Sequence, residues 1–222
     1  MITTPADSPL TRERIVAAAE DVLRRFGPSK ATVVDVARAL GVSHAAVYKH
    51  VATKAELRDL VVAQWAEATM PSLRAIAQEP GTAPERLRRL VDALIAVKRR
   101  KAAGDPELFA AYRMLAAGAQ SVVAAHVEEL VGLVAMVIRA GVEQGAFRQV
   151  DPVAMGRTVL IATSRFHHPA HAAEWAEPGI DAEFDDVWEL VMNGLRAQGT
   201  PAGREKARST SRDRPRKKKR GR

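Results

Sequence analysis

One stretch of the sequence, from Thr32 to Val51, has the residue pattern of a surface that recognises nucleic acid: TVVDVARALGVSHAAVYKHV. It predicts two short helices joined at Gly41, whose tolerance of positive φ permits the tight turn of a helix-turn-helix. Small Ala37 lets the two helices approach, and Val47 points back between them. The second helix is then left with small residues, which permit close approach to a groove floor, and polar ones, which reach base edges and phosphates. These residues are His44, Ala45, Ala46, Tyr48, Lys49 and His50.

The helices of this region also carry start signals. Thr32 and Thr53 are each followed three residues later by a carboxylate, the spacing of a capping box, and Ser43 can cap the helix between them. Thr32 and Lys54 therefore lie at helix N-termini, where free backbone N–H groups and the helix dipole attract phosphate.

About 50 of the 222 residues, from Arg12 to Val62, carry a more specific pattern. Its elements are Ile15, Ala18, Ala19, Phe26-Gly27, Thr32, Val36-Ala37, Leu40-Gly41-Val42-Ser43, Ala46 to Val51 and Thr53 to Leu57. In order and spacing this block resembles the N-terminal domain of the TetR (tetracycline-repressor) family of bacterial transcriptional regulators.

The resemblance implies a recognition helix that enters the major groove. Ser43, His44, Ala45 and Ala46 would then lie near base edges, and Thr32, Tyr48, His50 and Lys54 would contact phosphates. Lys49 stands where many relatives carry an aromatic residue, so base readout stays open. So do two structural alternatives, in which Tyr48 packs on the first helix or His50 is a buried histidine.

The elements around this motif are all expected to be helical. Apolar residues recur with a period of 3.6 along most of the chain, and no alternation typical of strands is found. We expect an all-α protein with four parts: a flexible N-terminus (1–9), a helix-turn-helix domain (10–52), a helical regulatory and dimerisation domain (53–198) and a disordered basic tail (199–222).

The last two long helices are the candidates for a dimer interface. The segment from Val153 to Thr163 is almost wholly apolar, with Arg157 as its one charge, and a helix of that kind must be covered on more than one side. A single helix-turn-helix makes few contacts, so specific binding usually needs two half-sites read by a two-fold dimer. The alternative is one intramolecular core. The interface residues we expect are Val159, Leu160, Val187, Trp188, Val191 and Leu195.

The family resemblance further implies a ligand cavity among the helices between about 83 and 142. The candidate lining residues are Phe109, Tyr112, Met114, Met136, Arg139, Arg165 and Phe166. At helical spacing such residues are also compatible with ordinary core. The two arginines would suit an anionic or carbonyl-bearing ligand.

Metal binding and catalysis have little support. His167 and His171 have the spacing of two ligands on one helix face, but Pro169 should break the helix between them. The sequence has no phosphate-binding glycine loop, no HExxH motif and no Gly-x-Ser-x-Gly elbow. The absence of cysteine excludes a disulfide framework, a thiolate metal site and a cysteine nucleophile. We therefore expect no enzyme activity, no metal and no cofactor.

The net charge of +8 is concentrated at the C-terminus. Residues 204–222 carry 11 Lys and Arg against 2 acids, which leaves a net charge of −1 for the rest of the chain. This tail is either a solvated charge run or an auxiliary site for nonspecific phosphate binding. No uninterrupted apolar run reaches the length of a membrane span, and the N-terminus has no signal-peptide pattern, so we expect a cytoplasmic protein.

Together these features predict a homodimeric regulator of transcription that binds a palindromic DNA operator and an unknown small-molecule effector. We expect a repressor that the effector releases from DNA. An activator, a regulator without an effector, and a helical body that binds a protein partner remain alternatives.

Overall fold

The computed structural model describes residues 9–28 and 32–197, so the predicted basic tail and all but the last residue of the predicted flexible N-terminus lie outside the described residues. Within these ranges the chain is all-α, and the one β-type contact is an isolated bridge between Phe147 and Arg196. The helices are α1 (Arg12–Phe26), α2 (Val33–Leu40), α3 (His44–Tyr48), α4 (Lys54–Glu67), α5 (Met70–Gln78), α6 (Ala83–Gly104), α7 (Pro106–Ala116), α8 (Gln120–Glu143), α9 (Pro152–Ala162), α10 (Ser164–His167), the short 3₁₀ turn η2 (Pro169–His171) and α11 (Ile180–Leu195).

Local signals set several of the helix boundaries. Gly27 (φ 73°) ends α1 and Gly41 (φ 68°) ends α2, both with the positive φ that glycine adopts without strain. The Asp105 carboxylate accepts from the Leu108 N–H at the start of α7, and that of Asp151 accepts from two N–H groups at the start of α9.

The helix-turn-helix motif extends to Val51, but its second helix, α3, ends at Tyr48. Helix α6 continues through the basic run from Lys98 to Lys101 as far as Gly104. The run lies inside the helix because Lys98 falls one turn after Leu94 on the same face, and both side chains are buried.

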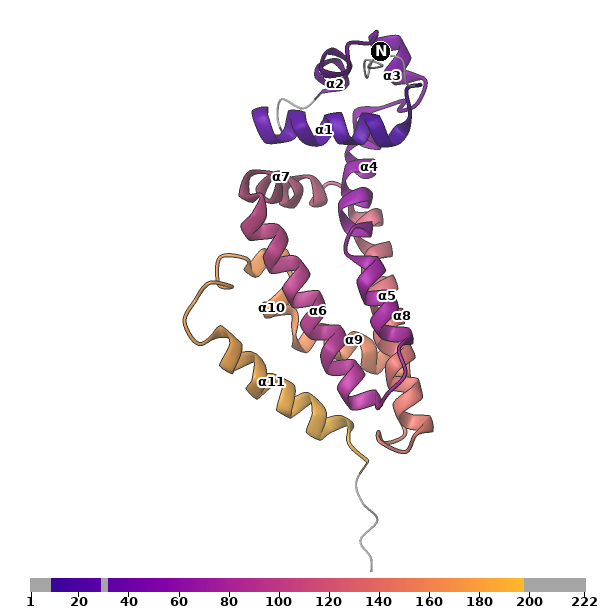
Figure 1. The fold of residues 1–222 in the computed structure, drawn as a ribbon, viewed down its shortest axis with the longest axis vertical. Coiled ribbons are helices and arrows are strands. Elements are labelled where there is room, and N and C mark those ends of the chain that lie inside the picture. Colours follow the sequence, from indigo (N-terminus) through magenta and orange to yellow (C-terminus); the bar gives the residue numbers. More distant parts are fainter. Residues whose placement is uncertain (1–8, 29–31, 198–222) are drawn as a thin grey trace, which may run out of the picture.

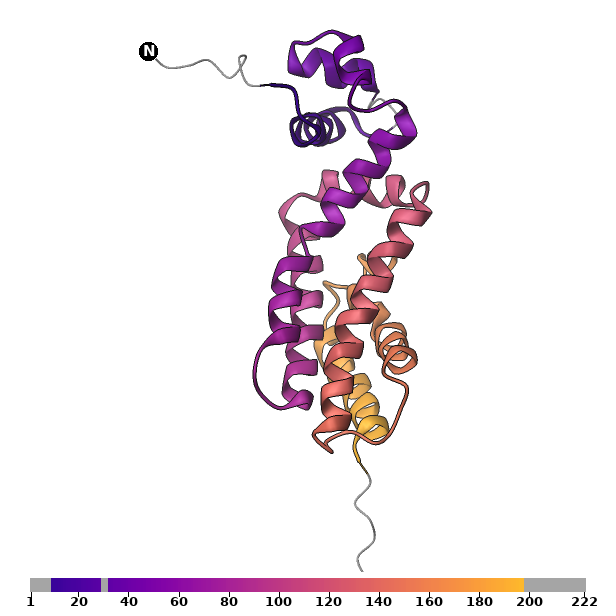
Figure 2. The same cartoon turned by 90° about the vertical axis from the view of Figure 1, so that its right-hand side faces the viewer.

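The molecule is elongated, with the small α1–α3 group at one end of its long axis and the longer helices below it (Figure 1). Helix α4 leaves this group and runs into the helical body, where α8 packs against both α4 and α9 (Figure 2). Helix α7 lies beneath α1 and contacts it, so two elements connect the N-terminal group to the body.

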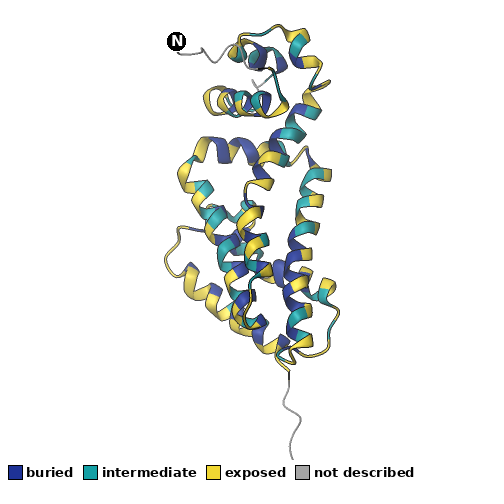
Figure 3. Ribbon diagram, turned by 45° about the vertical axis from the view of Figure 1, so that its right-hand side comes forward, coloured by how far each residue is buried: buried dark blue, intermediate teal, exposed yellow. Residues whose placement is uncertain are grey.

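Buried residues line the facing sides of the helices in both parts (Figure 3). The N-terminal core comprises Ile15, Val16, Ala19, Val22, Leu23, Val33, Val36, Ala37, Val47, Val51, Leu57, Val61, Leu108 and Ala111. A second group, the aromatic cluster, comprises Val62, Trp65, Phe109, Tyr112, Ala119 and Trp175. A larger body core joins α5, α6, α8, α9 and α11. Helices α4 and α7 contribute to both of the first two groups, so they join the N-terminal core to the body.

Helix α8 is the one described helix that is long and apolar enough to cross a membrane, with a window of mean hydropathy 1.8. Its buried residues, among them Val137 and Ile138, belong to the body core. The core helix of a globular protein passes the same test, so this feature is weak evidence for a membrane.

Candidate functional site

The helix-turn-helix is fixed by caps at the start of each of its helices. The Thr32 hydroxyl accepts from the Asp35 N–H (3.2 Å), and the Asp35 carboxylate accepts from the Thr32 N–H (3.3 Å), which completes the predicted capping box. The Thr32 hydroxyl also donates to the same carboxylate at 2.6 Å. The Ser43 hydroxyl accepts from the Ala46 N–H at 3.2 Å. Val47 is fully buried between the helices, as its position after the turn predicts. The start of α3 is therefore held rigidly against α2.

Arg12 fixes the other end of α3. Its Nε donates to the His50 carbonyl oxygen at 3.1 Å, and its terminal nitrogen pairs with a Glu56 oxygen at 3.1 Å. The second Glu56 oxygen accepts from the Ala52 N–H at 2.8 Å. Three segments, the start of α1, the turn after α3 and the start of α4, are thus joined by one guanidinium. Sequence reasoning missed this contact because no local spacing relates residue 12 to residues 50 and 56.

The exposed face of α3 carries the residues expected to touch DNA. Ser43, His44, Ala45, Tyr48 and Lys49 are exposed, as is Lys54 at the start of α4. Tyr48 exposes 48% of its surface, and His50 is half-buried with its ring in no described hydrogen bond. Ala46 and Thr32 are half-buried. His50 is therefore not a fully buried histidine, and a large part of the Tyr48 side chain is open to solvent.

A cavity of about 540 Å³ lies in the helical body where five helices meet. Its lining is mostly apolar and small, with polar groups contributed by α6, α7, α8, α9 and α10. The lining residues are Lys98, Tyr112, Arg113, Ala116, Ala117, Val123, His126, Val127, Leu130, Val131, Arg157, Leu160, Ile161, Ser164, His167, His168, Pro169 and Ala170. Its volume falls in the range of small-molecule sites.

The structure places one of the seven predicted pocket residues, Tyr112, at this cavity. Phe109 packs in the aromatic cluster beside Trp65, and Phe166 packs on Phe184 in the body core. Met114, Met136 and Arg139 are a correction to the prediction, because all three are exposed on outer helix faces.

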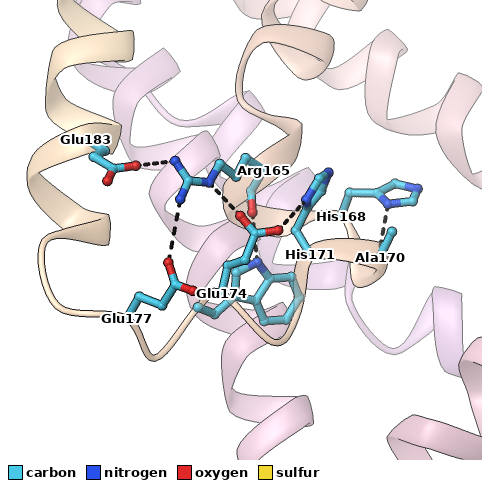
Figure 4. Close-up of polar contacts among 8 residues, drawn as sticks. Arg165, His168, Ala170, His171, Glu174, Glu177 and Glu183 are labelled. Atoms are coloured by element: carbon cyan, nitrogen blue, oxygen red, sulfur yellow. Dashed lines mark hydrogen bonds and ion pairs between the residues drawn. The ribbon is translucent and has the colours of Figure 1, made fainter.

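Arg165 also lies outside the cavity lining. Its guanidinium pairs with Glu174 (2.7 Å), Glu177 (3.7 Å) and Glu183, so it fastens the loop after α10 to the start of α11 (Figure 4). Its carbonyl oxygen accepts from the Trp175 indole N–H at 2.9 Å. The sequence suggested an anion-binding arginine, but the three carboxylates already neutralise it.

Three titratable side chains of the cavity were not predicted to lie there. Lys98 is 5% exposed, and burial, together with the nearby Lys101, lowers its pKa to about 8. Its Nζ lies 3.5 Å from the His126 Nε2. Burial lowers the pKa of His126 and of His167 to about 4, so both rings are neutral at pH 7. The sequence did hold a signal for Lys98, since it continues the buried stripe of Leu90, Leu94 and Ile95.

The histidine cluster does not gather around a metal site. As the proline predicts, α10 ends at His167 and Pro169 begins η2. His167 contacts the Thr163 hydroxyl at 3.3 Å, whereas His171 contacts Glu174 at 2.8 Å (Figure 4). Within residues 9–28 and 32–197, no three His, Asp or Glu side chains are grouped as ligands for one ion.

The expected interface residues on α9 and α11 face inward. Val159, Leu160, Trp188 and Leu195 are buried in the body core, and Val187 and Val191 are half-buried against it. The stripes that the sequence revealed are therefore the core-facing sides of these helices. The large apolar residues that α9 and α11 expose are Val153 (47%), Ile161 (66%) and Leu190 (74%).

Comparison with known proteins identifies both parts of the chain. Residues 15–61 match the family model described as bacterial regulatory proteins, tetR family, and residues 83–188 match the model of the tetracyclin repressor-like C-terminal domain. No curated protein sequence matches the chain.

Solved structures share the fold. They include a TetR transcription regulator from Haloarcula marismortui, with 22% identity over 83% of this chain and 98% of that one and a TM-score of 0.64. SmeT, the repressor of the Stenotrophomonas maltophilia multidrug efflux pump SmeDEF, has 17% identity over 89% of this chain and 96% of that one, with a TM-score of 0.64. A SmeT–triclosan complex has 16% identity over 85% and 92%, with a TM-score of 0.62.

Proposed function

The chain belongs to the tetR family of bacterial regulatory proteins, and we propose that it is a homodimeric repressor that leaves its operator when a small molecule binds in the helical body. Members of this family are DNA-binding regulators of transcription and not enzymes. We propose a cytoplasmic location, where a bacterial operator lies.

The observation that carries the proposal is the exposed face of α3 between two rigid attachments. Ser43 caps its start and Arg12 ties down its end, so the helix is held in one orientation without any partner. We propose that Ser43, His44, Ala45 and Ala46 lie near base edges, and that Tyr48, Lys49, His50 and Lys54 reach phosphates or the bases beside them. Thr32 has committed its hydroxyl to Asp35, so its end of α2 would hold phosphate through backbone N–H groups.

Dimerisation would place two such helices at the pitch of DNA. Two half-sites one helical turn apart lie about 34 Å from each other and require a two-fold symmetric protein. The exposed apolar residues on α9 and α11, Val153, Ile161 and Leu190, are our candidates for the interface. They replace the inward-facing residues that the sequence suggested.

The proposed switch runs through α7. Tyr112, Arg113, Ala116 and Ala117 line the cavity from this helix, and Ala111 packs in the N-terminal core against α1. An effector that displaces α7 or α4 would therefore change the orientation of α3 relative to its symmetric mate. Coupling of this kind is typically about 1–3 kcal/mol and depends on unequal affinity of the effector for the two states.

The cavity favours a small-molecule switch over a body that only binds a protein partner. A solid core would have favoured the latter, and a space of about 540 Å³ lies between the helices instead. The similarity to SmeT, a repressor whose complex with triclosan has been solved, supports the same reading. An activator would share the DNA site, and a transcription assay in vitro distinguishes the two by the sign of the effect.

A mobility-shift assay on the DNA upstream of the chain's own gene tests the proposal. Tyr48→Ala and Lys54→Ala alter exposed residues, so both variants should fold and bind this DNA about tenfold more weakly or worse. Arg139→Ala is the matched control, since it removes an exposed cation from α8, outside the N-terminal group. Wild-type affinity in both test variants would overturn the DNA-binding assignment.

A further inference from the structure

Resting on the ligand switch proposed above, we propose that the effector is an apolar molecule with a single carboxylate, which the Lys98 ammonium binds inside the cavity between α6, α7, α8, α9 and α10. Among the described residues, no carboxylate lies beside Lys98 to balance its ammonium charge. A bound ligand with a carboxylate would supply the missing negative charge.

Lys98 is a buried cation without an anion. It exposes 5% of its surface, and no carboxylate of the described residues lies within salt-bridge distance of its Nζ. Its described polar contact is the His126 ring nitrogen at 3.5 Å, a long contact with a neutral acceptor. A buried ammonium with so little compensation is costly, and an apolar side chain at this position would pack without that cost. A ligand that brings a negative charge beside Lys98 would offset this cost.

The charges around the cavity favour an anion. The lining contains Lys98, Arg113 and Arg157 and no Asp or Glu. Arg157 is already paired with Glu128 at 2.8 Å, and Arg113 is exposed at the rim, where water solvates it. One uncompensated buried positive charge matches one carboxylate.

The remaining lining favours an apolar body for the ligand. Val123, Val127, Leu130, Val131 and Leu160 supply most of the wall, and the cavity reaches the surface beside exposed Ile161. Small residues at the floor, Ala116 and Ala117, leave the space open. A strongly hydrated polyanion such as a nucleotide would lose its hydration against these side chains without replacement.

Four titratable side chains lie near Lys98, where a ligand carboxylate would bind. His126 lies near it on α8, His167 at the end of α10, His168 directly after that helix, and Lys101 on its own helix. The nearby histidines are disfavoured as cations in this setting, so they act as neutral hydrogen-bonding groups beside the ammonium. A bound carboxylate would relieve the burial penalty that lowers the pKa of Lys98.

Decanoate and 1-decanol are suitable probes because they share an apolar chain and differ in charge. Isothermal titration at pH 7 should show that the wild type binds decanoate more tightly than 1-decanol. Lys98→Met keeps the size of the side chain and suits its buried position, and it should weaken decanoate binding about tenfold or more while leaving decanol binding unchanged. Arg100→Met, at an exposed position of the same helix and outside the cavity lining, is the matched control and should keep the preference for decanoate. Thermal melts establish that each variant is folded.

A pH series provides a readout that a purely structural lysine would not alter. Because the ammonium must be protonated, decanoate affinity should fall as pH rises through about 8 towards 9.5, and decanol affinity should not. Equal affinity of the wild type for both probes, or unchanged decanoate binding in Lys98→Met, would overturn the inference.

Mobility shifts on the same preparations separate the two proposals. If the protein binds the operator but not decanoate, the carboxylate site is contradicted and the repressor proposal stands. If it binds decanoate through Lys98 but does not bind the operator, the repressor proposal is contradicted and the carboxylate site stands.

Discussion

Ala111 and Tyr112 are adjacent on α7, yet their side chains are buried in different clusters. Ala111 is 2% exposed and packs in the N-terminal core, whereas Tyr112 lies 4.1 Å from the Trp65 ring, centroid to centroid, and lines the cavity. Successive residues on a helix point about 100° apart, so one turn of α7 faces both the N-terminal core and the ligand cavity. This turn of α7 therefore connects the N-terminal core with the ligand cavity.

Enlarging Ala111 should therefore disturb DNA binding more than ligand binding. In Ala111→Leu the larger side chain would push α7 away from α1, because a buried position cannot absorb it, at a cost of about 1–3 kcal/mol in the free energy of unfolding. Operator affinity by mobility shift should fall at least tenfold while decanoate affinity by titration changes little. Ala110→Leu, at an exposed position on the same helix, should leave both unchanged. Equal losses in the two variants would contradict the role of α7.

Arg12 should act on DNA binding by positioning α3. In Arg12→Ala the His50 carbonyl and one Glu56 oxygen lose the guanidinium, and because this ion pair is exposed we expect the free energy of unfolding to change by less than about 1 kcal/mol. The freed turn after α3 should nevertheless weaken operator binding several-fold. Arg25→Ala removes the same charge from the opposite end of α1. It shows how much of the loss in operator affinity comes from the charge alone and not from the position of α3. Arg12→Lys, which keeps the charge and loses the planar fork, should be intermediate.

The sequence predicted those features that local chemistry decides. Gly41 ends α2 through its own backbone, and the side chains of Thr32, Ser43 and Thr53 cap α2, α3 and α4, as the sequence predicts. The helix-turn-helix was predictable because its turn, caps and wedge residues lie within 20 residues of one another.

Features that depend on packing between distant segments were not predictable in the same way. An apolar stripe identifies a buried face without saying which partner buries it, so Trp188 and Val159 were assigned to an interface and lie in the protomer's own core. Met114 has the composition of a pocket residue and is 65% exposed, because helical spacing alone does not give the orientation of α7. Lys98 continues the buried stripe of α6, but it also begins a run of four basic residues, and such a run is typical of a solvated helix end.

The basic tail should add affinity for DNA without adding specificity. Truncation after Gly199 removes the net charge of +9 that residues 204–222 carry, and each lost phosphate contact lowers the slope of log K against log salt by about 0.9. We expect a shallower slope for the truncated chain and an unchanged ratio of affinities for operator and random DNA. The measurement is a mobility shift at several salt concentrations, and an identical slope would show that the tail is not bound to DNA.

Buried histidines should make the protein sensitive to mild acid. The pKa of His167 is lowered by burial to about 4, so between pH 6.5 and 4 the unfolded chain binds a proton there that the folded chain does not. The free energy of unfolding should therefore fall as pH falls through this window, by on the order of 2–3 kcal/mol for this residue. His167→Gln should reduce the loss measured by urea unfolding between pH 7 and 5. His44→Gln, at an exposed position, should not, and equal curves for the two variants would contradict the assignment.

The exposed apolar side chains of α9 and α11 should hold the dimer together. Leu190 is 74% exposed on α11, so most of its side chain is not covered within its own protomer. Leu190→Asp would bury a carboxylate against its symmetric copy in a dimer and cost nothing in a monomer, so it should shift the equilibrium towards monomer. Light scattering after size exclusion should report half the wild-type mass, and operator affinity should fall because two half-sites are no longer read together.

Met114→Asp places the same charge at a 65% exposed position on α7 and should remain dimeric. A dimeric Leu190→Asp would mean that the copies meet on another face. If the wild type itself has the mass of one chain, the paired recognition helices are lost, and with them the geometric basis of operator recognition.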